Sequence, residues 1–137
     1  RRKTPVFGIC RFAQSIWSLN GGKIIQHITD HKNSNGTTDL AHYLFFDPKF
    51  KDLSSKIEKV TSRHHQAMDG RNLPEDFPLE VIAYGSKGTT SYQYPTDKDE
   101  RVVEIFQHKK RKIIGVQYHP EDQNDKLTDL LIERLLK

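Results

Sequence analysis

The stretch PVFGICRFAQ, residues 5–14, holds the single cysteine of the chain between two different patterns. VFGI (6–9) is a short apolar run, typical of a buried parallel strand. The residues after Cys10 instead have apolar side chains at helical spacing. The sequence therefore predicts a strand, a sharp turn at Cys10 and then a helix.

The predicted helix covers residues 11–20. Its expected buried face consists of Phe12, Ile16 and Leu19, and we expect Trp17 to pack in the same helix. The pair Gly21-Gly22 supplies the left-handed stop that commonly ends a helix.

Further apolar runs predict strands separated by polar loops. The runs are KIIQHI (23–28), AHYLFF (41–46), EKVTS (58–62), LEVIAYGS (79–86), RVVEIF (101–106) and KIIGVQY (112–118). The long polar segments 30–39 and 87–100 are predicted loops. From about residue 124 a last helix is expected, with Leu127, Leu130, Leu131 and Leu135 on one stripe. This order of elements predicts an α/β domain with a partly parallel sheet.

Length and composition restrict the class of protein. A chain of 137 residues has the length of about one domain, so we expect residues 1–137 to form a single domain. We expect its core to be thin, because apolar residues make up only 34% of the chain and the mean hydropathy is -0.75. One cysteine excludes an intrachain disulfide, and no run approaches the roughly 20 apolar residues of a membrane helix. We therefore expect a cytoplasmic protein without a membrane partner. Because the chain begins Arg-Arg-Lys without Met, we expect a fragment or a processed chain.

The net charge of +4 raises the question of a nucleic-acid partner. The basic clusters are residues 1–3 and HKKRK (108–112), and neither is interleaved with aromatic residues. HKKRK lies between two predicted strands, so a solvated hairpin turn is the preferred interpretation. We do not expect nucleic acid as a partner.

Position alone leaves two interpretations of Cys10. The start of a helix favours the thiolate, the nucleophilic form, through the helix dipole and free backbone N–H groups. Free cysteines are, however, among the most frequently buried residues, so a structural thiol is equally compatible with this position.

The stretch GVQYHPE (115–121) changes this balance. Pro120 restricts His119 to an extended backbone, in which residues i and i+2 project to one side, so His119 and Glu121 are expected to touch. A carboxylate that orients an imidazole, and an imidazole that accepts a thiol proton, form a triad with a nucleophile. The sequence therefore predicts Cys10, His119 and Glu121 as catalytic residues.

The stretches PVFGICRFAQ, VTSRHHQAM (60–68) and GVQYHPE, in this order, resemble the class-I glutamine amidotransferases. Within that family the sequence is most similar to the γ-glutamyl amide hydrolases of the γ-glutamyl-γ-aminobutyrate hydrolase-like branch. The resemblance runs from about residue 5 to the final helix. It implies a flavodoxin-like fold with a central, partly parallel sheet, and amide hydrolysis through a thioester without a cofactor.

The resemblance also implies roles for individual residues. Cys10 is the nucleophile, His119 the base and then the acid, and Glu121 orients His119. The backbone N–H of Arg11 is an expected oxyanion donor. The residues that match positions holding or lining the site of the γ-glutamyl group are Gln14, His64 and Gln66.

Two departures from the family pattern are present. The family has glycine two residues after the cysteine, where this chain has Phe12, which must point elsewhere or shift the helix. The family fold also has strands, helices and an oxyanion loop before the segment aligned with residue 5. We therefore expect an incomplete domain that needs an N-terminal segment, and an exposed apolar sheet edge.

Three functions remain open. The first is a hydrolase acting on a small γ-glutamyl substrate, such as glutamine or a conjugate. The second is a glutaminase subunit that delivers ammonia to a synthase partner. The third is a binding or regulatory protein on a decayed enzyme fold. His27 and His31 have helical ligand spacing but lie in a predicted strand and loop, so no metal site is expected.

Overall fold

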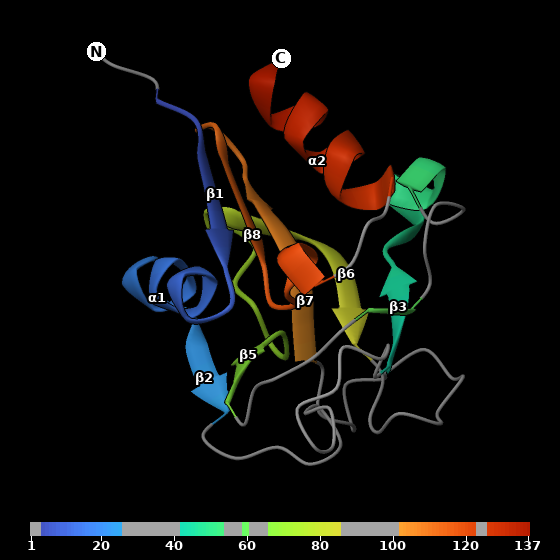
Figure 1. Cartoon of the computed structure of the whole chain (residues 1–137). Coiled ribbons are helices and arrows are strands. Elements are labelled where there is room, and N and C mark those ends of the chain that lie inside the picture. The colour runs from blue at the N-terminus through green and yellow to red at the C-terminus, as the bar shows by residue number, and fades with distance from the viewer. Residues whose placement is uncertain (1–3, 26–41, 54–58, 61–65, 86–101, 123–125) are drawn as a thin grey trace.

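The computed structural model describes residues 4–25, 42–53, 59–60, 66–85, 102–122 and 126–137 (Figure 1). Its strands are β1 (Val6–Ile9), β2 (Lys23–Ile25), β3 (His42–Phe46), β4 (Lys59–Val60), β5 (Ala67–Asp69), β6 (Leu79–Gly85), β7 (Val102–His108) and β8 (Ile113–Val116). The α-helices are α1 (Arg11–Leu19) and α2 (Lys126–Leu136), and the 3-10 helices are η2 (Pro48–Leu53) and η3 (Pro120–Asp122).

The strands form one mixed sheet. Its main order is β1-β8-β7-β6-β3-β4, and β5 pairs with both β2 and β7. β1 and β8 run parallel, with Ile9 opposite Val116, whereas the other described pairs are antiparallel. The expected partly parallel sheet is therefore confirmed, and its parallel pair joins the first and last strands.

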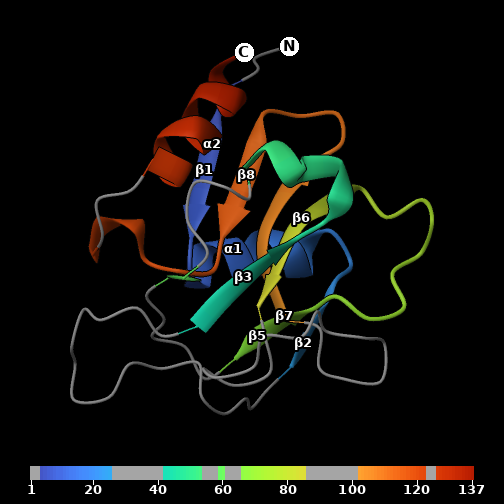
Figure 2. The ribbon, with the colours of Figure 1, turned by 90° about the vertical axis from the view of Figure 1, so that its right-hand side faces the viewer.

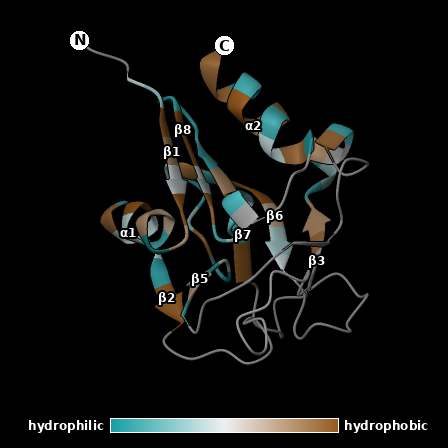
Figure 3. Ribbon diagram, in the orientation of Figure 1, coloured by the Kyte–Doolittle hydropathy of each residue, from teal (hydrophilic) through white to brown (hydrophobic). Residues whose placement is uncertain are grey.

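The helices cover opposite faces of this sheet (Figures 1 and 2). On one face α1 packs with residues of β5, β6 and β7, in a cluster that contains Trp17, Met68 and Phe106. On the other face α2 and η2 share a cluster with β6, β7 and β8 that contains Phe50, Ile114 and Leu131. Hydrophobic residues follow the central strands and alternate with polar residues along both helices (Figure 3). The result is a three-layer α/β arrangement.

The face that α1 buries differs from the predicted one. Ala13, Ile16 and Trp17 are buried, whereas Phe12 is 56% exposed and Leu19 is 87% exposed. The helix and the expected packing of Ile16 and Trp17 are therefore confirmed, whereas the expected burial of Phe12 and Leu19 is wrong. The reason is Trp17, which packs edge-on against the ring of Phe77 and so sets the rotation of the helix.

The glycines after α1 have separate roles. Gly21 has φ +94°, the left-handed conformation predicted for the helix stop. A Cβ on Gly22 would lie 2.3 Å from Nε1 of Trp17, so this position has no room for a side chain. Trp17 Nε1 also donates to the carbonyl of Lys23 at 3.1 Å, which fixes the chain as it enters β2.

Most of the other predicted elements are confirmed where the structure describes them. HKKRK begins at the end of β7 and forms the turn to β8, and the His108 ring accepts bonds from the N–H groups of Lys110 and Arg111. Leu127, Leu131 and Leu135 are buried in α2 as expected. The predicted loops 30–39 and 87–100, and residues 26–28 of the predicted strand 23–28, lie outside the described residues. β5, η2 and η3 were not predicted.

Neither of the two described α-helices is long and apolar enough to cross a membrane.

Candidate active site

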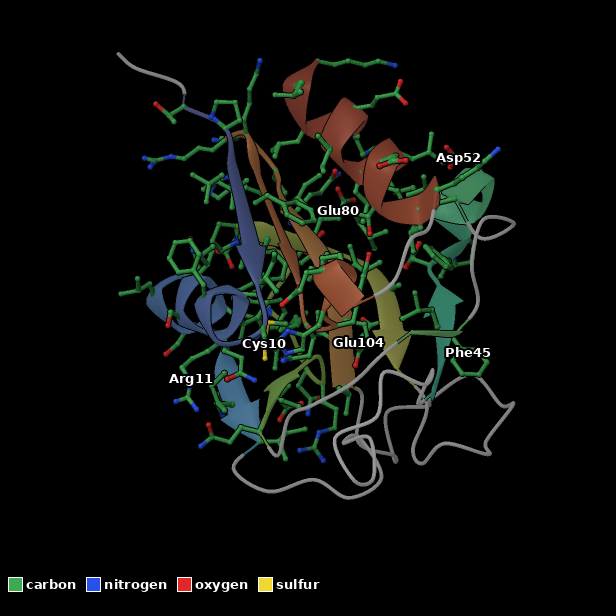
Figure 4. The ribbon with its side chains drawn as sticks, in the orientation of Figure 1. Cys10, Arg11, Phe45, Asp52, Glu80 and Glu104 are labelled. Carbon is green, nitrogen blue, oxygen red and sulfur yellow. The ribbon has the colours of Figure 1, made fainter. Side chains whose placement is uncertain are left out.

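Cys10 lies at the corner between β1 and α1, with φ +52° and ψ -111° (Figure 4). Few residues other than glycine adopt this conformation, which turns the chain sharply. The Cys10 N–H donates to the carbonyl of Val116 at 2.8 Å, which extends the parallel ladder by one residue. The Cys10 carbonyl accepts from the N–H of Gln14 at 3.0 Å and so begins the helix. The predicted strand, sharp turn and helix are thus present.

The parallel pairing of β1 with β8 brings two distant parts of the sequence together. Parallel strands end at the same edge of a sheet, so the residues after β8 emerge beside Cys10. These residues are Gln117, Tyr118 and His119; the first two are fully buried and His119 is half-buried. This edge is the candidate active site.

His119 and Glu121 make the predicted contact. His119 Nδ1 and Glu121 Oε2 are 2.8 Å apart, with the imidazole 18% and the carboxylate 57% exposed. The backbone reason differs from the predicted one, because Pro120–Asp122 forms the short 3-10 helix η3 instead of continuing as extended chain. A direct contact between His119 and Cys10 stays a prediction.

Three glutamines connect α1, the start of β5 and the end of β8 to the cysteine. Gln14 Nε2 donates to the backbone carbonyl of Gln66 at 3.0 Å and to Oε1 of Gln117 at 2.9 Å. Gln117 Nε2 in turn lies 3.5 Å from Sγ of Cys10. The predicted site residues Gln14 and Gln66 therefore lie on a chain of hydrogen bonds that ends at the sulfur.

Burial raises the pKa of the Cys10 thiol above its ordinary value. The backbone N–H of Arg11 opposes this by donating to the sulfur, and the Arg11 guanidinium and the Gln117 amide act in the same direction. The negative charge of Glu104 adds to the increase. The helix start thus favours the thiolate as expected, but desolvation outweighs it, so a base is needed to deprotonate Cys10 near neutral pH.

Glu104 and Gln117 lie near Cys10 at the candidate site and were not predicted from the sequence. Glu104 is a fully buried carboxyl residue on β7, and its backbone carbonyl accepts from the N–H of Gln117 at 2.8 Å (Figure 4). The available signal was a charged residue inside the apolar run RVVEIF, since a buried carboxylate is rarely placed without a role. For Gln117 the signal was its position between a strand and His119.

Some predicted positions lie outside the described residues. His64 of the predicted glutamyl pocket is one, and His27 and His31 are two others. In the part of the chain that the structure describes, no three His, Cys, Asp or Glu side chains gather as a metal would require.

A separate hollow of about 510 Å³ lies where α1 ends, lined by residues 21–23, 69, 71–74 and 77. Arg71 forms a two-bond ion pair with Asp69, with both contacts at 3.0 Å. Burial raises the pKa of Asp69, but the bonds from Arg71 outweigh burial and hold that pKa below its usual value. None of the predicted site residues that the structure describes lines this hollow.

The chain belongs to the family Glutamine amidotransferase class-I, whose pattern matches residues 1–136. The carbamoyl phosphate synthase small chain of Aquifex aeolicus is 32% identical over 121 residues, which cover 88% of this chain and 26% of that protein. A GMP synthase subunit of Methanococcus vannielii, described as glutamine-hydrolysing, is 25% identical over 135 residues, covering 98% of this chain and 60% of that protein.

A solved structure described as a GMP synthase subunit from Thermoplasma acidophilum has the same fold, with a TM-score of 0.61 and 19% identity. The match covers 98% of this chain and 57% of that one. The chain thus spans from about a quarter to three fifths of the length of these relatives.

Proposed function

We propose that this chain hydrolyses the side-chain amide of glutamine and delivers the ammonia to a synthase partner. In this proposal Cys10 is the nucleophile, His119 the general base and acid, and Glu121 the residue that orients His119. Arg11, Gln14, His64 and Gln66 hold the glutamyl group or its oxyanion. The substrate is a small molecule, and the chemistry needs no cofactor.

One observation supports this proposal most directly. Cys10 and the His119–Glu121 pair follow two strands that lie side by side and run parallel, so a strained cysteine and a carboxylate-bound imidazole lie at one edge of the sheet. Nucleophilic acyl transfer requires a nucleophile, a base and a group that orients the base, and this placement supports those roles for Cys10, His119 and Glu121. The arrangement comes from residues more than 100 positions apart, such as Cys10 and Gln117.

The proposed reaction has two halves. In the first, His119 accepts the thiol proton of Cys10, and the sulfur attacks the amide carbon of glutamine. The tetrahedral oxyanion is stabilised by the N–H of Arg11 and collapses to a thioester, while His119 protonates the departing ammonia. In the second half, His119 takes a proton from water, and the hydroxide attacks the thioester carbon. The C–S bond then breaks and releases glutamate, and His119 returns the proton to the sulfur, which restores the free thiol.

The comparisons favour a glutaminase subunit over the γ-glutamyl amide hydrolase that the sequence resemblance suggested. The relatives reported above are subunits of synthases, and one of them is described as glutamine-hydrolysing. We therefore take glutamine as the substrate and ammonia as the product to be passed on.

The proposal is tested with a glutamine analogue that carries an electrophilic diazoketone in place of the amide. We expect it to alkylate Cys10 once, detected by intact mass, and glutamine to protect against this reaction. Cys10→Ala removes the target, and Glu121→Gln should slow the labelling by roughly 10²-fold or more because the imidazole loses its orienting carboxylate.

Hydrolysis and partner dependence are measured in parallel. Glutamate release from glutamine should exceed release from γ-glutamyl anilides, and a synthase partner should increase it. A preference for the anilides would favour the γ-glutamyl amide hydrolase instead. Binding of glutamine without labelling or glutamate release would identify a decayed enzyme and refute the proposal.

A further inference from the structure

Gln117 is fully buried, although its side chain carries one acceptor and two donors. The structure satisfies both ends of this amide: Oε1 accepts from Gln14 at 2.9 Å and Nε2 lies 3.5 Å from the Cys10 sulfur. Its backbone N–H is bonded to the carbonyl of Glu104. The residue is therefore held at three points, one of which is the sulfur of the candidate nucleophile.

The direction of the amide follows from its neighbours. The backbone carbonyl of Gln66 can only accept, so the side-chain group of Gln14 that faces it must be the NH₂. The same NH₂ faces Gln117, which must therefore present its oxygen to Gln14. The NH₂ of Gln117 is then left to face the sulfur. The backbone carbonyl of Gln66 thus fixes the orientation of the Gln117 amide at Cys10, through the side chain of Gln14.

We propose that Gln117 is a positioning residue that presents an N–H donor to the Cys10 sulfur, and that Gln14 and the Gln66 carbonyl set the direction of this donor. This inference rests on the proposed function, in which Cys10 is the nucleophile, and adds a residue to it. Because Gln66 is itself predicted to line the glutamyl pocket, the chain of bonds would also connect that pocket to the sulfur.

The Gln117 donor is one of several groups that change the pKa of the Cys10 thiol. Glu104 on β7 and burial disfavour the thiolate, whereas the N–H and guanidinium of Arg11 on α1 favour it. His119 follows β8 and is the proposed base. Burial and Glu104 raise the pKa of Cys10, and only Arg11 and Gln117 lower it among the groups that act on the free thiol. Without the Gln117 donor, Arg11 alone would oppose the increase. Loss of the amide should therefore raise the pKa of Cys10.

The test is the pH dependence of alkylation by iodoacetamide, measured by intact mass without substrate. The chain has a single cysteine, so every adduct reports on Cys10. The midpoint of the profile is read instead of the rate, because a change in accessibility scales the rate equally at each pH. We expect Gln117→Met to move the midpoint up by about one pH unit, the effect of losing one donor to a charged group. Gln14→Met should move it in the same direction by less.

Gln107→Met is the matched control. Gln107 bonds to Glu80 and Arg134, away from this chain of bonds, so its loss should leave the midpoint unchanged. An unchanged midpoint in a folded Gln117→Met variant would overturn the inference. If that variant does not fold, the half-buried Gln14 carries the test, and an unchanged midpoint in Gln14→Met has the same meaning. Because alkylation needs no turnover, a chain that fails to hydrolyse glutamine would refute the proposed function and leave this readout intact.

Discussion

At the scale of single residues, the conformation of Cys10 has an energetic consequence. A φ of +52° with a ψ of -111° is accessible to glycine but strained for any residue with a Cβ, at about 1–3 kcal/mol. The thiol is therefore held in place at the expense of stability. Such strain is common where a functional group must be presented at a fixed angle.

We predict that Cys10→Gly is more stable than Cys10→Ala by about 1 kcal/mol. Both changes remove the thiol, but only glycine removes the strain, and part of the gain is offset by the greater backbone entropy of glycine in the unfolded chain. Urea unfolding of both variants measures the difference. An alanine variant as stable as the glycine variant would show that the corner is unstrained.

The residues of the site differ in how far the sequence reveals them. Cys10, His119 and Glu121 belong to short motifs with local geometry, so the turn at Cys10 and the contact between His119 and Glu121 could be predicted. Their catalytic roles stay a prediction. For Gln117 and Glu104 the sequence holds only weak signals, because their positions near Cys10 depend on the pairing of β7 with β8 and of β8 with β1. Their common property, burial of a polar side chain, becomes visible only in the folded chain.

At the scale of elements, β7 and β8 pack closely where a glycine of β8 faces an aromatic ring of β7. Gly115 lies opposite Phe106 in the antiparallel ladder, and a Cβ on Gly115 would lie 2.3 Å from the Phe106 ring. Both residues are buried. The aromatic ring thus occupies the space that a side chain on β8 would need.

We predict that Gly115→Ala lowers the free energy of unfolding by about 1–3 kcal/mol through overpacking. Phe106→Leu should lower it as well, by leaving a void, but the double variant should be more stable than the sum of the two changes predicts. Chemical denaturation of the three variants gives the coupling free energy. Strict additivity would mean that the ring moves aside without resistance.

The elements were predicted with uneven success for physical reasons. Long apolar strands such as β6 and β7 were evident because burial on both faces leaves a continuous hydrophobic run. The three-residue β5 was missed because it is too short to show a period, and its place in the sheet comes from pairing with β2 and β7. In α1 the spacing revealed a helix, but Trp17 and its partner Phe77 decided which face is buried.

At the scale of the whole molecule, one edge of the sheet is formed by β1. Among the described residues β1 pairs with β8 alone, so its other edge carries no strand. Phe12 adds apolar surface here: a Cβ on Gly8 of β1 would lie 3.4 Å from its ring, and the side chain is 56% exposed. An unpaired strand beside exposed apolar surface favours association. The additional N-terminal strands expected from the sequence stay a prediction.

We predict that this chain, prepared alone, associates with increasing concentration, and that Phe12→Lys reduces the association. Leu136→Lys is the control, because Leu136 is also exposed, at 61%, but lies on α2 on the opposite face of the sheet. Sedimentation equilibrium over a range of concentrations distinguishes the variants. A monomer at all concentrations, or equal effects of the two substitutions, would contradict the prediction.

The parallel pairing of β1 with β8, the first and last described strands, also determines when the candidate active site can form during synthesis of the chain. Cys10 and Gln117 are 107 positions apart, and at ribosomal rates that interval lasts roughly 5–20 s. Throughout this interval the cysteine has been made but β8, the strand that pairs with β1 among the described residues, has not. The entropy cost of closing so long a loop must be met before the contacts between β1 and β8 can form. A nascent chain released before β8 is made would therefore carry Cys10, the proposed nucleophile, without Gln117 and His119 beside it.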